Sequence, residues 1–152
     1  QANDLVGRKT ARDGGRMARA VAAQIEKTEG ELIASGTADA KAVARRLGAA
    51  REAFLGVVDF IAGGAKAHPN DVYAGSVPYL MLAGNLVAGW QLARALLVAQ
   101  ELSSKGQDAA FMQAKIATAR FYAEHILAKA PGQRDAIVEG AASVMALTPE
   151  AF

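Results

Sequence analysis

The apolar residues of this chain recur at helical spacing, and this periodicity constrains the fold more than any other feature. The clearest case lies in residues 37–63, where the apolar positions are Val43, Leu47, Ala50, Phe54, Val57 and Ile61. Steps of three and four place such side chains on one face of an α-helix. No run alternates between apolar and polar residues, as a half-buried strand would. The pattern therefore predicts an all-α protein.

Five segments share this helical pattern. They span approximately residues 13–35, 37–63, 71–104, 108–129 and 134–146. Glycine or proline stands between consecutive segments, at Gly36, Pro69, Gly106 and Pro131, where these residues commonly end helices. Because the connections are short, neighbouring helices should run antiparallel. We expect an antiparallel up-down four-helix bundle with a short fifth C-terminal helix.

The third segment contains 22 consecutive residues without a charge, 72–93. A stretch of this length could cross a bilayer. However, it includes Pro78, Asn85 and Gln91, and its flanks lack a strong positive bias, so we expect a central bundle helix that is buried on most sides and no transmembrane segment. Pro78 should either kink this helix or mark its true start, with Ser76 as the N-cap.

Composition excludes several functional classes. Alanine dominates the apolar residues, aromatic residues make up only 6%, and there is no cysteine to form a disulfide or a thiolate site. The 17 Lys and Arg residues are balanced by 15 Asp and Glu residues. The densest basic segment, from Arg8 to Arg19, has no interleaved aromatic residues, so we interpret it as a solvated or interdomain face and expect no nucleic-acid partner.

No motif identifies catalytic, cofactor-binding or metal-ligating residues. His68 falls in a turn and His125 near a helix end, and neither belongs to a cluster with metal-ligand spacing. The run from Gly84 to Gly89 lacks the Lys-Ser/Thr that a phosphate loop requires, so we interpret its small residues as sites of close helix packing. Trp90 and Gln91 could line a pocket, but an anchor in a core or interface is the favoured interpretation for Trp90. The residues alone predict a soluble helical bundle.

Four short stretches resemble a known family. These are Gln1–Lys9, Ala74–Leu82, Gly89–Ala95 and Lys115–Ala123. They resemble the acyl-CoA dehydrogenase family, specifically members of the 3-methylmercaptopropionyl-CoA dehydrogenase type that carry an extra C-terminal helical domain. The resemblance implies that residues 1–12 are the tail of an upstream helical domain and a linker, and that residues 13–152 form the C-terminal bundle domain.

The resemblance also implies a parent enzyme with bound FAD. Such enzymes remove a proton and a hydride from adjacent carbons of an acyl-CoA to form a 2,3-enoyl-CoA. Their base is usually the Glu of a Tyr-Glu-Gly-Thr motif, which this chain lacks, so we expect the chain alone to be inactive and to hold no cofactor. The implied partners are the upstream domains, the acyl-CoA substrate of the parent and further copies in a homo-oligomer, in the cytoplasm. A free-standing helical module that binds another protein is the alternative.

Overall fold

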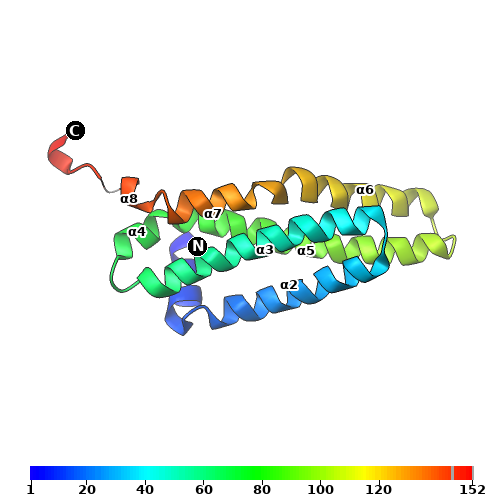
Figure 1. Cartoon of the computed structure of the whole chain (residues 1–152), viewed down its shortest axis with the longest axis horizontal. Helices are drawn as coiled ribbons and strands as arrows, with labels where there is room; N and C mark the ends of the chain where they lie inside the picture. The colour runs from blue at the N-terminus through cyan, green and yellow to red at the C-terminus, as the bar shows by residue number, and fades with distance from the viewer. Residues whose placement is uncertain (145, 152) are drawn as a thin grey trace.

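The computed structural model describes residues 1–144 and 146–151, and within these residues every regular element is a helix. The prediction of an all-α fold is therefore confirmed. Four long helices lie side by side along the long axis of the molecule, and each runs opposite to the one before it (Figure 1). They are α2 (Arg16–Ser35), α3 (Ala38–Gly64), α5 (Ser76–Ser104) and α6 (Ala109–His125).

Shorter elements connect and extend these helices. The N-terminal segment comprises α1 (Ala2–Asp4), the π-helical turn η1 (Leu5–Thr10) and the 3-10 turn η2 (Ala11–Asp13). The connection before α5 contains α4 (Pro69–Ala74). The C-terminal part contains η3 (Leu127–Lys129), α7 (Ala130–Val138), α8 (Ala141–Val144) and η4 (Pro149–Ala151).

Helix α3 lies at the centre of the packing. It contacts α2, α5, α6 and α7, and all six residues of its predicted apolar stripe are buried. The helix begins as the sequence predicts, since the Thr37 hydroxyl accepts a hydrogen bond from the Ala40 amide at 3.2 Å. On α2 the sequence predicts an apolar stripe of Ala18, Val21, Ile25 and Leu32. This prediction is right at Ile25 and Leu32 but wrong at Val21, which is exposed while Ala22 is buried.

A buried tyrosine ties the N-terminal segment to the core. Tyr79 of α5 stacks on Phe54 of α3, with the ring centroids 5.8 Å apart. Its hydroxyl forms a hydrogen bond of 3.0 Å with the hydroxyl of Thr10 in η1. Burial raises the pKa of Tyr79, and the hydrogen bond from Thr10 partly opposes this effect. Residues preceding α2 are thus packed on the bundle.

The predicted third helix is wrong in its continuity. It breaks at Gly75 into α4 and α5, and Gly75, not Ser76, is the N-cap of α5. A Cβ atom at Gly75 would lie 2.7 Å from Cγ2 of Ile137, so the close approach of α7 requires glycine there. Pro78 lies in the first turn of α5, where its missing N–H leaves no intrahelical hydrogen bond unmade.

The boundary between the fourth and fifth segments also differs from the prediction. Helix α6 ends at His125, and Pro131 stands in the first turn of α7 instead of ending the preceding helix. Proline is favoured in this position because its fixed φ suits a helix start. The predicted helix 134–146 is divided between α7 and α8, and position 145 lies outside the described residues.

The expectation that α5 is buried on most sides is wrong. Only 28% of its most apolar 18-residue window is buried within the protein. Val77, Met81 and Val98 expose 62%, 54% and 54% of their surfaces. Neighbouring helices cover α5 on its inner side, and in the described residues no element covers its outer side. Among the described residues α5 is also the one helix whose length and composition would suffice to cross a membrane.

Replacing Phe54 by alanine should lower the free energy of unfolding by about 3–5 kcal/mol. Phe54 is only 6% exposed and stacks on Tyr79, so the substitution would leave a cavity between α3 and α5. Phe121→Ala is the matched control, because Phe121 is 60% exposed and its loss should cost less than about 1 kcal/mol. Urea denaturation of both variants measures the difference, and equal midpoints would contradict this placement of the core.

The Tyr79→Phe variant should lose less stability at high pH than the unsubstituted chain. Because the pKa of Tyr79 is raised in the folded state, the unfolded chain releases this proton first as the pH rises. The stabilisation is fully present below about pH 10 and declines above it. Urea denaturation at about pH 8 and about pH 10.5 compares the two proteins. An identical loss in both would show that Tyr79 does not contribute.

Candidate functional site on helix α5

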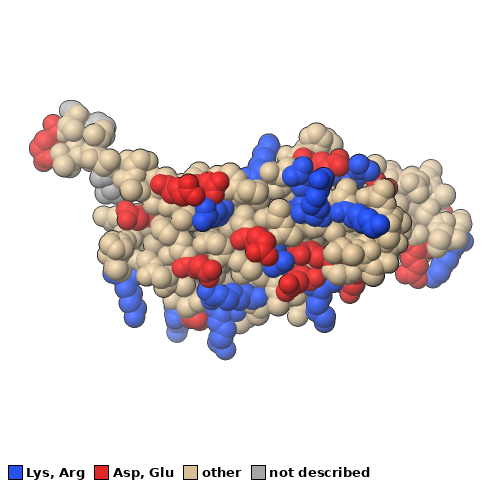
Figure 2. All heavy atoms as spheres, viewed as in Figure 1, with Lys and Arg blue, Asp and Glu red and all other residues tan. Residues whose placement is uncertain are grey.

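Helix α5 has two chemically different faces. Its inner face packs on the bundle through Ser76, Tyr79, Leu82, Leu86, Gly89, Ala93, Leu96 and Ala99. Its outer side is exposed. A row of seven exposed positions along it is called here the α5 seam: Val77, Met81, Gly84, Ala88, Gln91, Ala95 and Val98. Val87, Arg94 and Glu101 are exposed beside the seam. The seam contains no charged residue. By contrast, the face over α2, α3 and α7 carries basic and acidic side chains interspersed (Figure 2).

A groove lies at the C-terminal end of the seam. It has a volume of about 570 Å³ and is open to solvent. Its apolar floor includes Val98 and Leu102 of α5, and Phe111 of α6, which is 51% exposed, also lines it. Two cations border it, Arg94 and Lys115, and the Lys115 ammonium lies 5.0 Å from the Phe111 ring centroid. Such an open apolar groove suits a protruding side chain better than an enclosed small molecule.

Trp90 anchors α5 to α2. Its indole N–H donates a hydrogen bond of 2.8 Å to the hydroxyl of Thr28, and its ring packs against the core. The Arg94 guanidinium lies 5.8 Å from the Trp90 ring centroid and donates a hydrogen bond to the Gln91 side chain. The favoured interpretation of Trp90 as an anchor is confirmed. Gln91 is exposed on the seam and lines the groove.

The small residues of α5 lie on both its inner and its outer side. Gly89 is buried, and a Cβ atom there would lie 2.6 Å from Cδ1 of Leu127, so the turn η3 approaches the helix backbone. This confirms close packing at Gly89. Gly84 and Ala88 point outward instead, and a Cβ atom at Gly84 would meet no neighbouring atom within 4 Å. These two residues leave the backbone of α5 accessible from outside.

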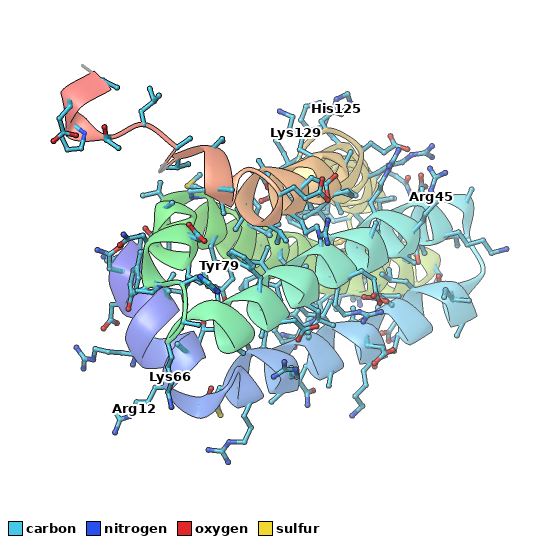
Figure 3. All side chains as sticks on the ribbon, turned by 60° about the vertical axis from the view of Figure 1, so that its left-hand side comes forward. Arg12, Arg45, Lys66, Tyr79, His125 and Lys129 are labelled. Carbon is cyan, nitrogen blue, oxygen red and sulfur yellow. The ribbon has the colours of Figure 1, made fainter. Side chains whose placement is uncertain are left out.

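The histidines do not form a site together. His68 precedes α4, whereas His125 ends α6 and stacks on Phe121 at 4.4 Å between ring centroids. Figure 3 places His125 beside the α6–α7 connection and shows Arg12 and Lys66 away from it, near the end of the bundle where α2 begins. In residues 1–144 and 146–151, no three His or acidic side chains are close enough to hold a metal ion.

The most buried ion pair joins α2 to α3. Arg51 donates hydrogen bonds of 2.7 and 3.1 Å to the two carboxylate oxygens of Glu29, and each side chain is only 12% exposed. Glu52 and Glu26 lie further out, at 3.0 and 3.8 Å from the guanidinium. The hydrogen bond to Glu29 is the main reason that the pKa of Arg51 is raised. This bidentate geometry holds two helices together and leaves neither group free for acid–base chemistry.

No signal in the sequence identified the seam in advance. From Val77 to Val98 the outer positions advance in alternating steps of four and three, but the buried positions from Tyr79 to Leu96 advance by three and four in the same way. A helix that is apolar on both faces gives no indication of which face is inside.

Comparison with known proteins gives consistent matches. A family model described as "Acetyl-CoA dehydrogenase C-terminal like" matches residues 17–148. The 3-methylmercaptopropionyl-CoA dehydrogenase of Ruegeria pomeroyi is 48% identical over 145 residues, which cover 95% of this chain and 24% of that protein. The broad-specificity linear acyl-CoA dehydrogenase FadE5 of Mycobacterium tuberculosis is 30% identical, over 100% of this chain and 26% of that protein. The chain thus spans about a quarter of the length of these curated relatives.

Replacing Glu29 by alanine should lower the free energy of unfolding by about 2–3 kcal/mol, because it leaves the Arg51 guanidinium largely buried without its main partner. Glu26→Ala is the control. Glu26 is 66% exposed and contacts the same guanidinium at 3.8 Å, so its removal should cost less than about 1 kcal/mol. Thermal or urea denaturation gives both values, and a smaller effect at Glu29 than at Glu26 would contradict the structural role.

Proposed function

This chain belongs to the family of acetyl-CoA dehydrogenase C-terminal-like domains, and on that premise we propose that it is an accessory domain of an FAD-dependent acyl-CoA dehydrogenase. The family match over residues 17–148 carries the proposal. It also confirms the resemblance that the sequence suggested. In this role the domain supplies packing and assembly surfaces, while the catalytic base and the flavin site belong to other domains of the parent enzyme.

The interior of the bundle supports a scaffold role. Three polar pairs link its elements: Thr10 with Tyr79, Thr28 with Trp90, and Glu29 with Arg51. They join η1 to α5, α2 to α5, and α2 to α3 respectively. Because buried polar groups that are fully paired rigidify a core, these contacts fix the relative positions of the helices. The side chains involved hold the bundle together and are not available to a ligand.

We propose that FAD is held by other domains of the parent enzyme. The groove beside α5 supports this assignment, because it is open, is largely apolar and has a volume of about 570 Å³, whereas the phosphates of a dinucleotide are commonly bound by backbone N–H groups at a helix N-terminus. In the parent enzyme, bound FAD would supply the hydride acceptor for oxidation of an acyl-CoA to a 2,3-enoyl-CoA. We infer that this chain contributes to that reaction indirectly, by helping to hold the other domains of the parent enzyme in place.

The organisation of the parent follows from the same proposal. Residues 1–12 are the tail of the preceding helical domain and a linker, and residues 13–152 are the accessory domain, with α2, α3, α5 and α6 as its antiparallel up-down bundle. The burial of Val6 and Thr10 against this bundle supports a firm connection between the two parts. The parent is a cytoplasmic enzyme with the upstream domains and further copies of itself as partners.

The proposal predicts that the 152-residue chain alone neither retains FAD nor oxidises an acyl-CoA, whereas a full-length protein containing it does both. Positioning a flavin and a thioester requires groups from several domains. Both forms should be purified, their absorbance recorded in the flavin band, and their turnover measured with a dye acceptor and several acyl-CoAs. A full-length variant with Glu29→Ala, which loosens the α2–α3 contact, should keep its activity at low temperature and lose it at a lower temperature than the unsubstituted enzyme.

Two results would contradict the proposal in different ways. Stoichiometric flavin and turnover in the 152-residue chain alone would place the active site within it. Absence of flavin from both forms would contradict membership in a flavoenzyme and would favour the free-standing interaction module.

A further inference from the structure

We propose that the α5 seam is a self-association surface, on which α5 of a second copy of this chain lies antiparallel. The seam is exposed over its whole length, although no residue between positions 72 and 93 carries a charge. Exposed apolar surface of this extent marks an interaction site in soluble proteins. The proposal concerns how copies assemble, and it holds whichever reaction the parent protein catalyses.

The spacing of the seam fits a helix pair. Its positions advance by four and three residues alternately, and Leu102, half-buried beside the groove, continues the same spacing. Side chains at this spacing stay in contact with a partner helix along a left-handed crossing. An antiparallel pair centred between residues 89 and 90 gives a layered register. Its layers pair Val77 with the partner's Leu102, Met81 with the partner's Val98, Gly84 with the partner's Ala95, and Ala88 with the partner's Gln91.

The register matches the sizes of the side chains. Each of the central layers contains a small residue, because Gly84 meets the partner's Ala95 and Ala88 meets the partner's Gln91, and these small residues let the two backbones approach closely. Larger residues meet at both ends, where each protruding Met81 is directed toward the partner's groove. That groove has an apolar floor and presents an exposed phenylalanine, Phe111, beside Val98. One surface therefore supplies both the protruding side chain and the hollow that receives it, as a two-fold interface requires.

Charge also favours the antiparallel direction. The antiparallel register places Arg94, which borders the seam, opposite the partner's Asn85, an uncharged amide. A parallel pair would place Arg94 beside the partner's Arg94 and Met81 against the partner's Met81, so that like charges would meet and the two grooves would remain empty. In the antiparallel register the two Arg94 side chains are therefore kept apart.

The size of the contact is sufficient for a specific dimer. From Val77 to Leu102 the helix is about 38 Å long at about 1.5 Å per residue. A helix pair of this length, together with Phe111, buries a total area of roughly 1,000 Å² or more, which reaches the lower limit for specific interfaces. The central small residues reduce the apolar area, so we expect a dissociation constant in the micromolar range.

Sedimentation velocity of the 152-residue chain tests self-association. The unsubstituted chain should shift from monomer to dimer between about 1 and 100 µM. Ala88→Glu places a long charged side chain in the seam and should weaken the dimer at least about 100-fold, because position 88 lies where the two backbones approach most closely and leaves no room for it. Ala20→Glu is the matched control, since Ala20 is exposed on α2 outside the seam. Its dimer should be unchanged, and circular dichroism should show the same helicity in all three proteins.

Disulfide trapping tests the direction of the pair, because the natural chain has no cysteine. Within one helix, positions 81 and 98 lie about 25 Å apart and cannot form a disulfide with each other. The double variant Met81→Cys with Val98→Cys should therefore form disulfide dimers on mild oxidation. Trypsin would separate the two cysteines into peptides 67–94 and 95–105, and mass spectrometry should find one linked to the other. Each single variant should give no disulfide dimer.

The possible outcomes are distinct from those of the functional proposal. If the chain stays monomeric at about 100 µM, it does not self-associate through the seam. The same conclusion holds if the monomer instead binds phospholipid vesicles or another domain. If a single variant forms disulfide dimers in which two identical peptides are linked, the antiparallel register is wrong. A dimer that Ala88→Glu leaves intact shows that copies associate through another surface. The flavin content and activity of the full-length protein do not affect any of these results.

Discussion

The apolar face of α3 is the constraint on which the rest of the structure depends. The helices α2, α5, α6 and α7 pack most extensively against this helix, and the shorter elements η1, α4 and η3 also touch it. Its buried residues combine alanines with Val43, Leu47, Phe54 and Ile61. The alanines allow neighbouring backbones to approach, and the larger side chains fill the space between them at the density typical of protein interiors. A shift in the orientation of α3 would therefore disturb its contacts with all of these helices at once.

The central position of α3 explains the unusual exposure of α5. Neighbouring helices cover the inner side of α5, including Tyr79 and Leu86, whereas its outer side has no covering element within the described residues. Helix α5 carries no charge from position 76 to position 93, so the exposed side of this stretch is more apolar than the surface of a monomeric protein usually is. The exposed side is therefore best understood as a surface for a further contact. This interpretation agrees with a domain that spans about a quarter of its relatives.

Features that depend on local residue spacing could be predicted from the sequence, whereas features that depend on contacts between distant residues could not. The stripe on α3 was predictable because a run of apolar residues at helical spacing is a local property. The break at Gly75 was not, because one glycine is compatible with a continuous helix, and its close contact with Ile137 joins residues that lie far apart in the sequence. Pro131 was misinterpreted for a related reason, since proline is compatible with a helix start as well as with a helix end.

The sequence by itself determined the all-α class, the approximate positions of the long helices and, through short matching stretches, the family. Tertiary structure alone decided which side of α5 faces outward and which polar residues meet, as in the pairs of Arg51 with Glu29 and Trp90 with Thr28. The physical reason is that periodicity reports a helix and its apolar side, but a helix apolar all round has no preferred side. Its orientation depends on how neighbouring helices pack, and the partners in these pairs lie 22 and 62 residues apart in the chain.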